Sequence, residues 1–82
     1  MYISYNELNS DYILIDVRTS YEYNKNHLDN FINIPLNNIY SIKKYNINSK
    51  IVVYCDQGRR SFIAYNILRQ MGYLNVFVLK VK

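Results

Sequence analysis

The chain has 82 residues, which is enough for one compact domain and too few for a two-domain enzyme. Half of the residues are apolar and 20% are charged, which excludes an intrinsically disordered chain. The formal net charge is +4, but the basic residues are scattered and the only basic doublets are Lys43–Lys44 and Arg59–Arg60, so we expect no nucleic-acid binding. The composition therefore predicts a single globular domain over residues 1–82.

No apolar run approaches the roughly 20 residues that cross a bilayer, and the segment Met1–Glu7 lacks the basic and apolar regions of a signal peptide. We therefore expect a cytoplasmic protein without membrane contact. One cysteine and one histidine are too few ligands for an ordinary metal site, and one cysteine forms no internal disulfide. We expect no metal and no cofactor, with a stability that depends on packing.

Short apolar runs alternate with polar or amphipathic segments, which predicts an α/β fold with a short, mainly parallel sheet flanked by helices. The longest of these runs are continuous rather than alternating, as is typical of strands buried on both faces. In chain order, the predicted strands are Tyr2–Ile3, Tyr12–Val17, Phe31–Ile34, Ile51–Tyr54 and Val76–Leu79.

One long helix is predicted over Ser61–Met71, and Gly72 follows where a left-handed C-cap is needed. Its apolar residues recur at helical spacing and form one face: Ala64, Ile67, Leu68 and Met71. Three shorter helices are predicted earlier in the chain, two of them at pairs with capping-box spacing and one after a proline: Ser4 with Glu7, Thr19 with Glu22, and Leu36–Lys44 after Pro35.

The candidate chemistry lies between the fourth predicted strand and the long helix, in Cys55–Ser61, which holds the only cysteine. In a parallel α/β sheet, ligands bind beyond the carboxyl ends of the strands, and the amides of a strand–loop–helix turn point into the loop. Those amides and the guanidinium groups of Arg59 and Arg60 stabilise a thiolate, so Cys55 is predicted to be a nucleophile at neutral pH. Gly58 suits a tight loop that needs a positive φ.

A purely structural role is the alternative for Cys55, because free cysteine is among the most buried residue types. The glycine and the two arginines that follow within five residues, and the helix after them, favour the catalytic role instead.

The loop has the form Cys-x-x-Gly-x-Arg-Ser, and three further segments precede it in order: Leu14–Arg18, Glu22–Tyr23 with His27–Leu28, and Asn33–Leu36. The loop resembles the active site of rhodanese-like sulfurtransferases, and the three segments resemble that family's Asp-Val-Arg strand, its Glu-Phe/Tyr and Gly-His-Ile segment and its Asn-Ile-Pro turn. The resemblance covers residues 14–79 and implies a three-layer rhodanese-like fold.

The resemblance implies that Cys55 takes the outer sulfur of a donor such as thiosulfate, holds it as a persulfide and passes it to a thiol, cyanide or protein acceptor. The loop amides from Asp56 through Gln57 and Gly58 to Arg60 are expected to cradle the persulfide. Arg60 is expected to anchor the loop or attract an anionic donor, and Arg59 to add positive potential. The six residues from Cys55 to Arg60 match the sulfurtransferase form of the loop, whereas phosphatases of this fold use one residue more.

Two other function classes remain open. The first is a catalytically weak binding or thiol redox-sensing module that keeps the fold and a reactive thiol. The second is an anion or nucleic-acid binder that uses the basic loop.

Three other residues are expected to be structural. Asp16 and Arg18 stand at the carboxyl end of a central strand, and we expect Arg18 to form an ion pair with Glu22 rather than to touch substrate. His27 is expected to be a hydrogen-bonded framework residue.

The chain departs from the family pattern at Asn26, where the family has glycine, at Asn30–Phe31, and at its end. It stops at Val81–Lys82, where the family continues with Gly-Gly and a final helix. We expect this C-terminal shortening to leave one sheet face or the pocket rim less covered, and the protein to be a monomer or a weak homodimer.

Overall fold

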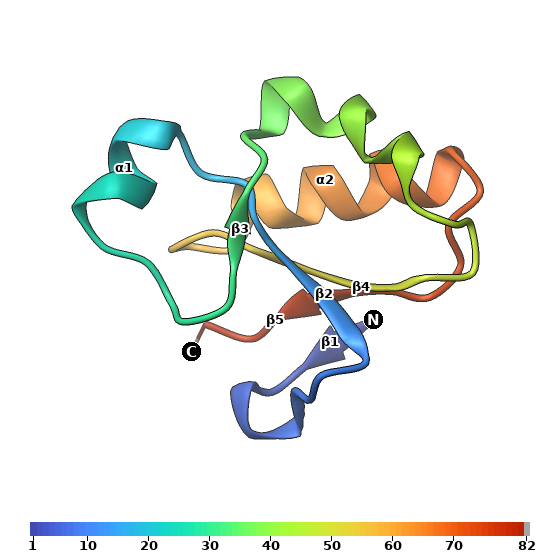
Figure 1. Cartoon of the computed structure of the whole chain (residues 1–82), viewed down its shortest axis with the longest axis horizontal. Coiled ribbons are helices and arrows are strands. Elements are labelled where there is room, and N and C mark those ends of the chain that lie inside the picture. Colours follow the sequence, from blue (N-terminus) through green and yellow to red (C-terminus); the bar gives the residue numbers. More distant parts are fainter. Residues whose placement is uncertain (82) are drawn as a thin grey trace.

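The computed structural model describes residues 1–81 and contains a five-stranded sheet in which every neighbouring pair of strands is parallel (Figure 1). The strand order is β1-β5-β4-β2-β3. All five predicted strands are present, two of them slightly shortened: β1 Tyr2–Ile3, β2 Tyr12–Asp16, β3 Ile32–Asn33, β4 Lys50–Tyr54 and β5 Val76–Leu79. The predicted α/β class is confirmed.

The helices also follow the predicted order: the 3₁₀ helix η1 Tyr5–Glu7, α1 Ser20–Lys25, the 3₁₀ helix η2 Leu36–Lys44 and α2 Arg59–Gln70. Both predicted capping boxes form, and Gly72 has the expected positive φ of +105°. α2 begins two residues before the predicted Ser61, because Gly58 takes a left-handed conformation and turns the chain directly into the helix.

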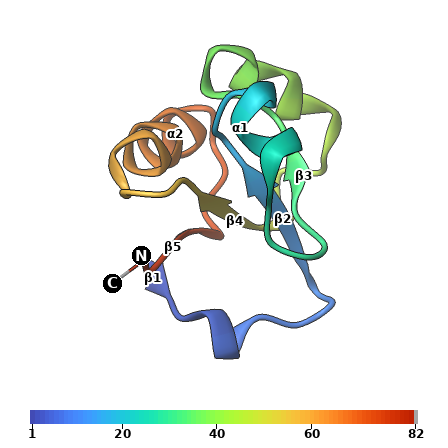
Figure 2. The same ribbon diagram turned by 90° about the vertical axis from the view of Figure 1, so that its left-hand side faces the viewer.

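The two faces of the sheet are covered unequally. The main core lies between the sheet and the helices α2 and η2, which bury Ala64, Leu68, Ile39 and Ile42 against it. The opposite face carries a smaller cluster around Val52, to which Leu8 and the loop residues Leu28 and Phe31 contribute. Figure 2 shows α1, α2 and η2 on one side of the sheet and the N-terminal segment on the other.

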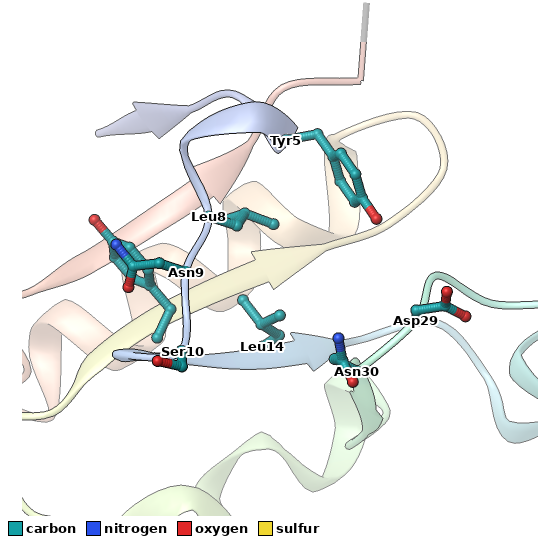
Figure 3. A pocket seen from close by; sticks show the side chains of 8 residues that line it. Tyr5, Leu8, Asn9, Ser10, Leu14, Asp29 and Asn30 are labelled. Carbon is teal, nitrogen blue, oxygen red and sulfur yellow. The ribbon is translucent and has the colours of Figure 1, made fainter.

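A cavity of about 510 Å³ lies on this second face, between the N-terminal segment and β2 (Figure 3). Leu8 and Leu14 contribute apolar walls, and Asp29 and Asn30 stand at one end. The cavity is lined by no residue of the cysteine loop, so the candidate chemistry lies elsewhere.

Candidate active site

Cys55 follows β4 directly, and its side chain is buried with a relative exposure of 1%. Its sulfur accepts two backbone hydrogen bonds, from Gly58 N at 3.1 Å and from Ser61 N at 3.2 Å. Ser61 Oγ lies 3.4 Å from the same sulfur and donates its own hydrogen to the carbonyl oxygen of Gly58 at 3.1 Å. Two amide donors aimed at one sulfur favour negative charge on it, because hydrogen bonds to an ionised acceptor are roughly twice as strong as neutral ones.

The conformation of Gly58 produces this arrangement. Its φ of +85° reverses the chain three residues after Cys55 and starts α2, and the turn directs both the Gly58 and the Ser61 amides at the sulfur. An added Cβ would lie 3.9 Å from Val81 Cγ2, so the requirement for glycine comes from the backbone conformation and not from lack of space.

Arg60 anchors the loop to helix α1. Its Nη1 and Nη2 donate to Glu22 Oε1 and Oε2 at 2.7 and 3.1 Å, and Nη2 also lies 3.4 Å from Asp56 Oδ1. These hydrogen bonds raise the pKa of Arg60 and lower the pKa of Glu22 to about 2. Of the two roles predicted for Arg60, the geometry favours the anchoring one, because carboxylates already balance its charge.

The predicted ion pair between Arg18 and Glu22 is wrong. Arg18 donates instead to Asp16, with Nη2 2.9 Å and Nε 3.1 Å from Oδ2, and its Nη2 also donates to the Asn26 carbonyl at 2.8 Å. Asp16 is fully buried, so its carboxylate requires a partner inside the protein, whereas Glu22 is occupied by Arg60. The hydrogen bond from Arg18 to Asp16 raises the pKa of Arg18.

Glu22 and Asn33 help to hold the loop framework. Glu22 was predicted to be a capping residue and an ion-pair partner of Arg18, but its Oε1 accepts from Thr19 N at 2.9 Å and from Arg60 Nη1 at 2.7 Å. Asn33 Nδ2 donates to the carbonyl oxygens of Asp16 and Arg18, both at 3.0 Å, and so ties β3 to the end of β2. The Asn-Ile-Pro motif was a usable signal for Asn33, since an amide before a proline turn is suited to bind backbone.

The remaining predicted residues lie at the surface or at the edge of the loop. Asp56, Gln57 and Arg59 are exposed. His27 is also exposed, with its ring stacked on Tyr23 at 3.7 Å between centroids and its Nδ1 2.8 Å from the Tyr23 carbonyl oxygen. His27 therefore stands in the hydrogen-bonded framework role that the sequence predicted.

Within residues 1–81, no helix has the length and apolar character needed to cross a bilayer. Nor does that part of the chain bring three His, Cys, Asp or Glu side chains together in a metal-binding arrangement.

Comparisons with known proteins show what the chain is similar to. The family model of the rhodanese-like domain matches residues 4–81. The thiosulfate sulfurtransferase PspE of Escherichia coli is 38% identical over 65 residues, which are 76% of this chain and 62% of that protein. A solved structure described as rhodanese with anions from E. coli has a TM-score of 0.74 and 35% identity, covering 87% of this chain and 91% of that one.

Some relatives are much longer. A probable molybdopterin-synthase adenylyltransferase of Porphyra purpurea is 39% identical over 67 residues, and the match takes in 76% of this chain but only 17% of that protein. The chain thus spans about a sixth of the length of that relative. The family match over residues 4–81 and the shared fold show that this chain belongs to the rhodanese-like domain family.

Proposed function

We propose that the chain is a single-domain sulfurtransferase or sulfur carrier that takes a sulfane sulfur onto Cys55 as a persulfide and passes it to a thiophilic acceptor. The observation that carries the proposal is the pair of loop amides, Gly58 N and Ser61 N, that donate to the Cys55 sulfur. A cradle of this kind stabilises a thiolate nucleophile and, later, a thiolate leaving group.

With thiosulfate as the donor, the proposed reaction has two steps. In the first, the Cys55 thiolate attacks the outer sulfur, the bond between the two sulfurs of thiosulfate breaks, and sulfite leaves with the electron pair. In the second, a thiolate or cyanide attacks the outer sulfur of the persulfide, and Cys55 leaves as a thiolate. The same two amides serve both steps, because each step has negative charge on the Cys55 sulfur.

The other loop residues have separate roles in this proposal. Gly58 supplies the turn and one cradle amide, and the main chain through Asp56 and Gln57 closes the loop around the sulfur. Arg60 holds the loop against Glu22, while the exposed guanidinium of Arg59 adds the positive potential that attracts an anionic donor. The E. coli relative named as a thiosulfate sulfurtransferase supports thiosulfate as a donor to test.

The proposal places the reaction in the cytoplasm, where acceptor thiols are kept reduced. It assigns the domain small sulfur donors and a thiol, cyanide or protein acceptor as partners, in a monomer or weak homodimer. It requires no metal or cofactor, because the persulfide chemistry uses the cysteine alone.

The test is intact-protein mass spectrometry after incubation with thiosulfate, followed by treatment with cyanide, with Cys55→Ser as the matched control. We expect the wild type alone to gain the mass of one sulfur atom and to lose it as thiocyanate. Absence of the adduct with thiosulfate, mercaptopyruvate and a cysteine desulfurase would contradict the proposal.

One observation favours a second candidate, a thiol redox sensor. Cys55 is only 1% exposed, which admits small oxidants such as hydrogen peroxide more readily than bulky donors. A sensor would gain one oxygen atom with peroxide, reversed by a thiol, and would gain no cyanide-labile sulfur.

A further inference from the structure

A cavity of about 490 Å³ lies beside the cysteine loop, on the side that faces β5. Gln57 and Gly58 form its loop wall, Tyr2 contributes from β1, and residues 78–81 line it from β5 and the segment that follows. Its volume is within the range of about 300–1,000 Å³ that is typical of small-molecule sites. This space is therefore large enough for an organic ligand.

Lys80 occupies a defined position next to the active site. Val53 of β4 lies opposite Val78 of the parallel strand β5, and Cys55 and Lys80 each follow two residues later. Both residues thus reach the same edge of the sheet on adjacent strands, and adjacent strands are about 4.8 Å apart. The Lys80 amide donates to the Ile3 carbonyl at 2.9 Å, which fixes its backbone at this edge.

The segment after β5 also runs alongside the loop itself. The Cβ position of Gly58 would lie 3.9 Å from Val81 Cγ2, so Val81 is at van der Waals distance from the turn that orients the cradle. Lys80 and Val81 also line a neighbouring cavity of about 340 Å³, which Tyr54 and Asp56 share. Lys80 therefore borders the spaces on both sides of this segment, next to the residues that flank Cys55.

The charges around the loop distinguish Lys80 from Arg60. The Arg60 guanidinium is bound by Glu22 and lies near Asp56, so its charge is already balanced. Lys80, by contrast, forms no ion pair among the described residues, although Asp56 borders the neighbouring cavity that Lys80 also lines. The 490 Å³ cavity is lined by Lys80 and by no Asp or Glu among the described residues, together with Gln57 and Tyr2, which carry neutral donor groups, and the apolar residues Leu79 and Val81.

We propose that this cavity binds the anionic end of an organic acceptor thiol, a carboxylate or sulfonate, and that Lys80 is the specificity-determining residue that selects for that charge. The inference rests on the proposed sulfur transfer and names the class of acceptor for the same site. The ammonium and the neutral donors bind the anionic group, while the apolar lining contacts the carbon chain of the acceptor. The acceptor thiol is thereby held beside the loop that carries the persulfide.

The transfer is a simple displacement. The acceptor thiolate attacks the outer sulfur of the Cys55 persulfide, the bond between the outer sulfur and the Cys55 sulfur breaks, and Cys55 leaves with the electron pair as a thiolate. The acceptor becomes the persulfide, and no external oxidant or reductant is consumed.

The test uses protein loaded with persulfide from thiosulfate, freed of donor, and then mixed with one of two matched thiols. The anionic thiol is 3-mercaptopropionate and the neutral one is 3-mercapto-1-propanol. The rate of persulfide loss is measured at concentrations well below saturation, and the ratio of the two rates is the readout, because it cancels effects on the cysteine itself. We expect the wild type to prefer the anionic thiol, and we expect Lys80→Met to lower that ratio about fivefold or more.

Two matched variants serve as controls. Lys50→Met removes the same charge from an exposed lysine at the start of β4, roughly 16 Å of strand away from Cys55, and should leave the ratio unchanged. Lys80→Arg keeps the charge and should keep most of the preference. Raising the salt concentration should lower the ratio in the wild type and have little effect in Lys80→Met.

The outcomes separate the two proposals. If the wild type loads with persulfide but Lys80→Met keeps the wild-type ratio, or if Lys50→Met lowers the ratio equally, the assignment of Lys80 is wrong and the proposed sulfur transfer stands. If the wild type never loads, both proposals fall together. Circular dichroism of Lys80→Met checks the fold, which we expect to be intact because the Lys80 side chain is exposed.

Discussion

Arg60 and Glu22 are 38 positions apart in the sequence and form a two-pronged ion pair, with N–O distances of 2.7 and 3.1 Å. The pair joins the first turn of α2 to the first turn of α1, and the same Glu22 carboxylate closes the capping box with Thr19. The cysteine loop is therefore held from outside as well as by its own backbone.

The first prediction concerns this anchor. Glu22→Ala removes the partner of Arg60 and opens the capping box, so the loop loses an external support while the Cys55 sulfur and the cradle amides remain. We expect sulfur-transfer kcat/KM to fall by roughly tenfold, because small displacements of a reacting group are costly. Lys25→Ala, on the same helix, is the control and should retain activity. Equal activities in the two variants would show that the ion pair does not position the loop.

The pH dependence of this support follows from the same pair. Arg60 lowers the pKa of Glu22 from an ordinary 4.5 to about 2, so folding favours the charged carboxylate. The stabilisation is fully present above about pH 4.5 and is lost as the pH falls toward 2. We expect urea unfolding to show a stability difference between wild type and Glu22→Gln that is constant from pH 6 to 8 and shrinks below pH 4.5. A difference that persists at pH 2 would contradict the ion-pair origin.

Gly58 is expected to be needed for both stability and activity. Gly58→Ala places a side chain at φ +85°, which costs about 1–2 kcal/mol and shifts the amides away from the Cys55 sulfur. Gly72→Ala, at φ +105° and at the other end of α2, is the matched control. We expect thermal unfolding to show that both variants are destabilised, and single-turnover persulfide formation to show that only Gly58→Ala is slowed in the folded protein. Slow persulfide formation in both Gly58→Ala and Gly72→Ala would show that general destabilisation, and not displacement of the cradle amides, lowers the rate.

The buried ion pair of Asp16 and Arg18 is expected to be structural. Asp16→Ala leaves Arg18, which is only 6% exposed, without its main partner. Removal of one partner of a buried pair costs about 3–5 kcal/mol. The double variant Asp16→Leu with Arg18→Met should recover much of that loss, because no charge is then left unpaired. Chemical denaturation of the wild type, Asp16→Ala and the double variant measures the loss of stability and its recovery. A double variant no more stable than Asp16→Ala would refute this account.

Features that depend on neighbouring residues were predicted correctly. The five strands, both capping boxes and the left-handed Gly72 depend on residues close together in the chain, and the apolar runs and turn residues were sufficient to predict them. The start of α2 was misplaced by two residues, since the backbone conformation of Gly58 and the loop around Cys55 decide it rather than apolar periodicity.

Contacts between residues far apart in the chain were not predicted correctly. The expected partner of Arg18 was Glu22, because Arg and Glu side chains at the surface commonly pair. Burial of Asp16 and the approach of α2 to α1 gave Arg18 and Glu22 other partners. The sequence also did not predict that Lys80 lies beside the cysteine loop, because this position depends on the pairing of β5 with β4.

The sequence by itself thus determined the elements and the family resemblance, and it located the cysteine loop, because these are set by local backbone preferences and by motifs within a few residues. The tertiary structure alone decided which charges meet. Strand order and helix packing bring together residues that are tens of positions apart, and the cost of burying an unpaired charge then selects among the partners within reach.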